Sequence, residues 1–98
     1  LGLRAPMVGH LGDGNFHVIL PYDPKEEGTY NKIRDFSDLL IEKTLELNGT
    51  ITGEHGVGLH KKAYLLKEHG DCIPLMKSIK RSIDQNNIMN PGKIFDLN

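Results

Sequence analysis

Mostly apolar residues recur with a helical period in the middle of the chain. They stand three or four positions apart, the spacing that brings side chains to one face of an α-helix. The stripe consists of Ile33, Phe36, Leu40, Thr44 and Leu47. Asn48 and Gly49 follow it, and both residue types adopt the left-handed conformation that ends many helices. The pattern therefore predicts an α-helix that ends at this pair.

Two further helices are predicted in the second half of the chain. The first has a stripe of Leu59, Ala63 and Leu66. Gly70 should end it, because glycine is a common helix terminator. Asp71 is a suitable N-cap for the next helix, in which Pro74 would occupy the first turn, where proline is tolerated. This helix is expected to end near Asn86-Asn87.

Two short apolar segments near the start, residues 6–10 and 15–20, are predicted to be strands. Asp13-Gly14 lies between them, and this dipeptide favours a tight hairpin because both central residues of the preferred turn need positive φ. If these two residues form a two-residue turn, His10 lies directly opposite His17 in the antiparallel pair. Thr50–Thr52 is predicted to be one more extended piece.

The order of these elements is typical of an α+β fold with short antiparallel strands and three helices. Two or three short strands make a poor sheet by themselves. We therefore expect strands from an upstream segment, or from a second copy of this chain in a homo-oligomer, to complete it. The chain begins with Leu1 rather than methionine, as in a piece of a longer protein or after removal of a tag.

The composition allows one small domain and excludes several partners. The chain has 98 residues, 38% hydrophobic and 26% charged, with a formal net charge of -1. A charge so close to zero gives no reason to expect nucleic acid or an anionic membrane as a partner. No apolar stretch approaches the length of a membrane span, and no signal-peptide pattern is present, so we expect a cytoplasmic location.

His10 and His17 form the first candidate site. Directly opposed residues of an antiparallel pair have Cβ atoms roughly 4.5 to 5.5 Å apart, which suits two imidazoles that bind one ion. The alternative is that one or both are hydrogen-bonded core or surface histidines. A catalytic zinc ion usually takes three ligands from the protein, so a histidine pair would need another donor.

Glu54 and His55 form the second candidate site. Glycines at positions 53, 56 and 58 flank them, so the backbone can bring the carboxylate of Glu54 close to a partner. The alternative is a tight connection in which Glu54 favours the dipole of a helix's first turn. His55, beside a metal-binding carboxylate, is suited to accept a proton near neutral pH, and it is equally compatible with a solvated position.

Three motifs together resemble a known family. They are Gly9-His10-Leu11-Gly12-Asp13-Gly14-Asn15-Phe16-His17, Gly53-Glu54-His55-Gly56-Val57-Gly58 and Met89-Asn90-Pro91-Gly92-Lys93. In this order they resemble the C-terminal domain of the FAD-linked oxidases of the vanillyl-alcohol oxidase superfamily. That group includes D-lactate dehydrogenases, D-2-hydroxyglutarate dehydrogenases and the flavin subunit of glycolate oxidase. Residues 1–98 would then be the C-terminal part of a ferredoxin-like substrate or cap domain.

The resemblance implies a role for each candidate residue. His10, His17 and Glu54 would bind a divalent metal, zinc or manganese. His55 would take the hydroxyl proton of a 2-hydroxy acid while a hydride passes to FAD, and Asn90 would approach the isoalloxazine ring. A eukaryotic member of this group would be mitochondrial, and a peripheral position on the inner membrane is compatible with it.

The family's FAD-binding domain does not appear in these 98 residues, nor do the arginine and lysine positions that bind the substrate carboxylate. The resemblance therefore implies that an FAD-binding domain lies upstream or in another chain, and that this chain alone neither binds FAD tightly nor turns over substrate. Two other classes stay open from the residues themselves. One is a small self-sufficient His/His/Glu metalloprotein such as a hydrolase, and the other is a metal-free structural or interaction domain.

Overall fold

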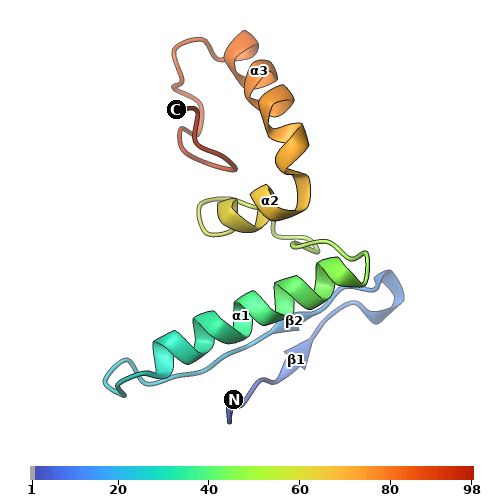
Figure 1. Ribbon diagram of the computed structural model, residues 1–98, viewed down its shortest axis with the longest axis vertical. Helices are drawn as coiled ribbons and strands as arrows, with labels where there is room; N and C mark the ends of the chain where they lie inside the picture. Colours follow the sequence, from blue (N-terminus) through green and yellow to red (C-terminus); the bar gives the residue numbers. More distant parts are fainter. Residues whose placement is uncertain (1) are drawn as a thin grey trace. The chain divides into compact units, whose positions relative to one another are not determined.

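A computed structural model describes residues 2–98 (Figure 1). The described chain divides into two compact units, one ending at Gly49 and the other spanning Thr50–Asn98. The architecture is α+β: a two-stranded antiparallel sheet and one long helix in the first unit, and shorter helices in the second. Within residues 2–98 we find no helix with both the length and the apolar character needed to cross a bilayer.

The first unit begins with a hairpin of β1 (Met7–Val8) and β2 (His17–Val18), and the register differs from the predicted one. Val8, not His10, lies opposite His17. The predicted two-residue turn at Asp13-Gly14 is also wrong, because Leu11–Asp13 form a short 3₁₀ helix that Gly14 ends at φ 69°.

The hydrogen bonds around this turn explain the shift. The amides of Asp13 and Asn15 both donate to the His10 carbonyl, at 3.0 and 3.2 Å, so the loop closes at His10 and Asn15. A four-residue loop with one left-handed residue near its end is a common hairpin connection. In this loop only Gly14 needs a positive φ, so Asp13 keeps the negative φ of the 3₁₀ helix.

The helix α1 spans Thr29–Glu46 and confirms the helix predicted from the central stripe. It begins eleven positions after Val18, the last residue of β2, and ends as the dipeptide Asn48-Gly49 predicts. Asn48 adopts φ 63°, its amide donates to Leu45, and the Gly49 amide donates to Thr44 at 2.8 Å. These two bonds define the Schellman motif, in which helix-terminal carbonyls find partners. A Cβ at position 49 would lie 2.8 Å from the Thr44 methyl group, which favours glycine there.

The second unit contains α2 (Lys62–His69), a 3₁₀ turn over Gly70–Cys72, and α3 (Ile73–Ile83). The helix α2 starts three residues later than its predicted stripe and ends at Gly70 as expected. Asp71 is not the N-cap of α3: it lies inside the 3₁₀ turn, and Cys72 precedes the helix. Thr50–Thr52 is an irregular segment without a strand partner in the described chain, so the predicted extended piece joins no sheet.

Few apolar side chains are buried among the described residues. They are Ile41 on α1, and Ile51, Leu65 and Ile73 in the second unit. Several large apolar side chains are exposed instead, and those on α3 recur at every fourth position as Leu75, Ile79 and Ile83. These three side chains therefore lie on one face of α3, because residues four positions apart share a helix face.

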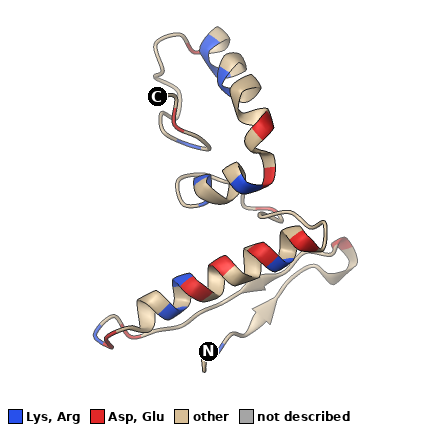
Figure 2. Ribbon diagram, in the orientation of Figure 1, with Lys and Arg blue, Asp and Glu red and all other residues tan. Residues whose placement is uncertain are grey.

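The helices of the two units differ in their balance of acidic and basic residues. Acidic and basic side chains are mixed along α1, whereas Lys and Arg predominate on α2 and α3 (Figure 2). The last turn of α3 carries Lys80 and Arg81. Cations at this position favour the helix because the helix dipole is negative at its C-terminus.

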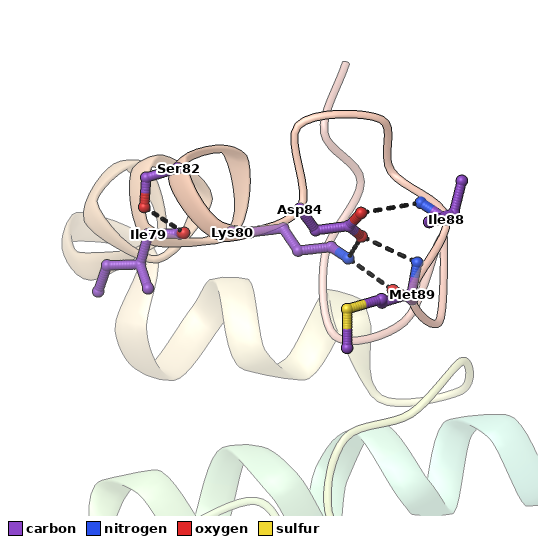
Figure 3. Close-up of polar contacts among 6 residues, drawn as sticks. All are labelled: Ile79, Lys80, Ser82, Asp84, Ile88 and Met89. Carbon is purple, nitrogen blue, oxygen red and sulfur yellow. Dashed lines mark hydrogen bonds and ion pairs between the residues drawn. The ribbon is translucent and has the colours of Figure 1, made fainter.

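Asp84 ends α3 and is the one buried charged residue of the described chain, with 7% of its surface exposed. Its carboxylate accepts the backbone amides of Ile88 and Met89, at 3.0 and 2.9 Å, and a bond from the ammonium of Lys80. The same ammonium donates to the Met89 carbonyl at 2.5 Å (Figure 3). We call these four residues the Asp84 cap. It fixes the backbone that leads into Asn90.

These bonds hold the pKa of Asp84 at about 2, below the ordinary value of 3.8. The hydrogen bond from Lys80 is the largest cause, and the amides of Met89 and Ile88 act in the same direction. Burial opposes them, because it disfavours the charged form. A folded pKa below the unfolded one stabilises the fold above pH 3.8, and the stabilisation is lost as the pH falls through 2.

Asp84→Asn is expected to lower the thermal unfolding temperature at pH 7, because an amide loses the ion pair and cannot accept three hydrogen bonds in the same way. The difference from the wild type should narrow as the pH falls from about 4 to about 2, since protonation removes the same charge from Asp84. Circular dichroism melts measure both effects. Asp71→Asn, at an exposed aspartate of the same unit, is the control and should change the melt less. Equal melts of Asp84→Asn and wild type at pH 7 would contradict the role of the cap.

Candidate functional site

The two hairpin histidines lie two levels apart in the hairpin. His10 is level with Asn15, and His17 is level with Val8. Residues two apart on a strand point to the same face, so this register leaves His10 and His17 on one face as diagonal neighbours. Diagonal pairs are about 7 to 8 Å apart, within reach of aromatic and long side chains. The prediction that His10 lies directly opposite His17 is wrong, but the two residues are still on the same face of the hairpin.

Gly9 stands between these two levels, and the opposite strand passes unusually close to it. A Cβ at position 9 would lie 2.2 Å from the Asn15 carbonyl oxygen and 2.5 Å from the Phe16 Cα. Both contacts are with backbone atoms, so no side-chain movement could relieve them. A side chain here would push the strands apart, and glycine is therefore a requirement of the hairpin that carries both histidines.

Asn15 adds a polar atom to the same hairpin. Its side-chain oxygen is buried, and it has no hydrogen-bond partner among the residues that the structure describes. Buried polar atoms in proteins are nearly always paired, so an orphaned one calls for a ligand, an ion or a water molecule. His17 is half-buried and His10 exposed, so both levels beside this oxygen remain accessible.

The glycine-rich loop, Gly53–Gly58, carries Glu54 and His55. Glu68 on α2 holds the segment that enters the loop: its carboxylate accepts the Thr50 hydroxyl at 3.0 Å and the Ile51 amide at 2.7 Å. The Glu68 side chain is only 12% exposed, and the His69 Nε2 lies 2.5 Å from the carboxylate oxygen that also accepts the Thr50 hydroxyl. The buried Ile51 side chain anchors the same segment. Bonds to Glu68 of α2 therefore fix the segment from which the loop begins.

Glu54 and His55 lie side by side in this loop. The His55 Nε2 is 3.9 Å from a Glu54 carboxylate oxygen, and their side chains are 44% and 73% exposed for Glu54 and His55 respectively. Because α2 begins only at Lys62, Glu54 is outside its first turn, and the helix dipole does not account for this glutamate. An exposed pair at this distance contributes little to stability.

The third motif forms a turn after the Asp84 cap. The Lys93 amide donates to the Asn90 carbonyl at 3.4 Å, with Asn90 at φ 45° and Gly92 at φ 77°. Asn90 itself is exposed. We call Asn90–Lys93 the Asn90 turn, and the residues that follow it the tail. Figure 1 shows the tail returning from the end of α3 toward α2.

The sequence patterns did not single out the residues that hold these segments. Asp84, Glu68 and Lys62 each make several bonds to backbone atoms or to a partner far along the chain. Asp84 had a local signal, because it lies four residues after Lys80, the spacing of a helical ion pair. For Glu68 and Lys62 the partners are 17 to 34 residues away, and no local pattern reveals them.

The fold and motifs define a domain of a flavin-linked oxidoreductase family. The family model "FAD linked oxidases, C-terminal domain" matches residues 1–94, and the chain belongs to this family. It is 43% identical over 96 residues to a protein of Danio rerio named "Probable D-lactate dehydrogenase, mitochondrial". It is 44% identical over 90 residues to the glycolate oxidase subunit GlcD of Bacillus subtilis, and 39% identical over 90 residues to a D-2-hydroxyglutarate dehydrogenase of Stutzerimonas stutzeri.

These alignments cover 97%, 89% and 89% of this chain but 19% of each relative. The chain thus spans about a fifth of the length of the curated relatives it matches.

Proposed function

We propose that this chain is the C-terminal part of an FAD-linked 2-hydroxyacid dehydrogenase, and that it supplies a divalent-metal site and the catalytic histidine. The observation that carries the proposal is the family match over residues 1–94. The substrate class comes from the names of the relatives, because lactate, glycolate and 2-hydroxyglutarate each have a hydroxyl group next to a carboxylate.

The ligands in this proposal are His10, His17 and Glu54. Two imidazoles and a carboxylate are a donor set that suits zinc or manganese. The shared face of the hairpin histidines and the orphaned Asn15 oxygen beside them fit a bound ion. The exposed Glu54 carboxylate, on a loop held at its stem by Glu68, fits a ligand that is open to an approaching ion.

His55 is the proposed base. When bound, a flavin supplies the two-electron acceptor and a divalent metal supplies a Lewis acid that lowers a hydroxyl pKa. An imidazole nitrogen of His55 accepts the hydroxyl proton as the C2 hydrogen leaves with its electron pair, and a 2-oxo acid is formed. Its neighbour Glu54 lies 3.9 Å away, so the proposed base and the proposed metal ligand are adjacent in the same loop.

The proposal also names the partner. An FAD-binding domain, upstream or in another chain, would hold the cofactor, with Asn90 of the exposed turn approaching the flavin ring. The exposed apolar stripe of α3 supports a covering protein surface, and the two-stranded sheet supports additional strands of a ferredoxin-like cap domain or of a second copy. The mitochondrial relatives support a mitochondrial location if the chain is eukaryotic.

Joining this chain to the FAD-binding portion of one of its relatives tests the proposal. The joined protein, loaded with FAD and zinc or manganese, is expected to show a flavin spectrum that bleaches when D-lactate, glycolate or D-2-hydroxyglutarate is added without an electron acceptor. L-lactate is the matched control for the D-configured substrates. A stable flavin spectrum that none of the 2-hydroxy acids bleaches would overturn the proposal.

A further inference from the structure

The tail and the glycine-rich loop are joined by a backbone hydrogen bond. The Ile94 amide donates to the Gly58 carbonyl at 2.8 Å, across 36 positions of the sequence. Ile94 adopts φ 72°, and the Phe95 amide donates to the Lys93 carbonyl at 2.8 Å, so Ile94 is the centre of a γ-turn with positive φ. This conformation is strained for a β-branched residue and persists only where the surroundings hold it.

Lys62 supplies a second connection at the same place. It is the first residue of α2, four positions after the loop's last glycine. Its ammonium donates to the Gly92 carbonyl at 3.1 Å and to the Asp96 carboxylate at 2.8 Å. The Lys62 side chain is 27% exposed and that of Asp96 70%, so the bond to Gly92 is partly shielded from water and the bond to Asp96 is exposed. Lys62 therefore bonds the Asn90 turn before the strained Ile94 and the tail after it.

We propose that Lys62 is a positioning residue for the reaction: by bonding Gly92 and Asp96 it holds the Asn90 turn and the tail against the glycine-rich loop. The loop that carries Glu54 and His55 and the turn that carries Asn90 then move as one element. The Asp84 cap fixes the other end of the same turn, through Ile88 and Met89. The link to catalysis rests on the function proposed above, whereas the link between loop and tail does not.

Amide hydrogen exchange tests the structural link in the chain itself. Lys62→Met keeps the aliphatic stem and removes the donor, and is expected to speed exchange of the Ile94 amide by about tenfold, the effect of losing hydrogen bonds to a charged group. Lys61→Met, at the adjacent lysine, is the matched control and should leave Ile94 unchanged. Lys62→Arg should restore slow exchange. The Leu65 amide, bonded to the Lys61 carbonyl within α2, reports whether the helix stays intact.

Equal exchange of Ile94 in Lys62→Met and Lys61→Met would overturn the proposal. If Lys62→Met also exposes the Leu65 amide, Asp96→Asn decides, because it leaves α2 unaltered and removes a partner of the ammonium. Faster Ile94 exchange in that variant supports the link, and unchanged exchange overturns it.

Flavin reduction tests the positioning role in the joined protein. Lys62→Met is expected to slow single-turnover flavin reduction by about 10-fold to 100-fold, the usual effect of losing a residue that orients ligands, with bound FAD unchanged. Lys61→Met should reduce flavin at the wild-type rate, and Lys62→Arg should recover most of it. Faster Ile94 exchange with undiminished flavin reduction would overturn the positioning role. If the wild-type joined protein reduces no flavin, the proposed function fails, and the exchange result still decides whether Lys62 couples loop and tail.

Discussion

His55→Gln is expected to lower the rate of flavin reduction in the joined protein by about 10²-fold to 10⁴-fold, the range that general bases contribute. Glutamine keeps a polar side chain of similar reach but cannot take up the hydroxyl proton. Most of the loss should be in kcat, because the proposed base acts on the reacting hydroxyl in the transition state. Stopped-flow absorbance of the flavin measures the rate constant, and steady-state kinetics separates kcat from KM.

His60→Gln is the matched control. This histidine is also exposed in the second unit, five positions further along, and carries no proposed role. Its replacement should leave flavin reduction within about twofold of the wild type, as expected for a surface site away from the chemistry. A His55→Gln protein that reduces flavin as fast as the His60→Gln protein would remove His55 from the mechanism.

The double variant His10→Ala/His17→Ala is expected to lower the affinity for zinc or manganese by more than about 100-fold. Loss of residues that only orient metal ligands already costs about 10-fold to 100-fold, and here two ligands are removed at once. Elemental analysis of protein purified without chelator measures the metal content, and competition with a chelator measures the affinity. The substitutions are compatible with the hairpin, since its close contact is at Gly9 rather than at either histidine.

Glu54→Gln should weaken metal binding as well, because diagonal histidines form a looser chelate than directly opposed ones and leave more of the affinity to the third ligand. His60→Ala serves as the control for the loss of an imidazole. Wild-type protein that contains no metal, or a double variant that retains the wild-type content, would exclude this site and favour the metal-free structural domain.

The family and the main helix were predictable from the sequence. The stripe from Ile33 to Leu47 predicted α1, and Asn48-Gly49 predicted its end, because a helix is stabilised by contacts and hydrogen bonds between residues three to five positions apart. The three motifs that carry the family resemblance lie within residues 9–93, and the family match over residues 1–94 confirms that resemblance. The hairpin was predicted too, but its register was not.

The hairpin register could not be predicted from the sequence, because the turn preference of Asp13-Gly14 points to another loop. Asp13-Gly14 favours a two-residue turn by its own preferences, whereas the observed loop closes at His10 and Asn15. A shift of this kind changes which residues oppose each other and leaves the alternation of apolar and polar residues almost unaltered. Local pattern alone therefore placed the two histidines on one face correctly and misjudged their distance.

The sequence by itself determined the fold class, the α1 helix and the candidate residues, since these depend on short-range periodicity and on motifs of a few residues. Only the tertiary structure decided the hairpin register, the Asp84 cap and the bonds of Lys62 and Ile94 to partners that lie 30 to 36 positions away. Such bonds depend on the path of the chain through space, because side chains and carbonyls that are distant in sequence must arrive at hydrogen-bond distance together.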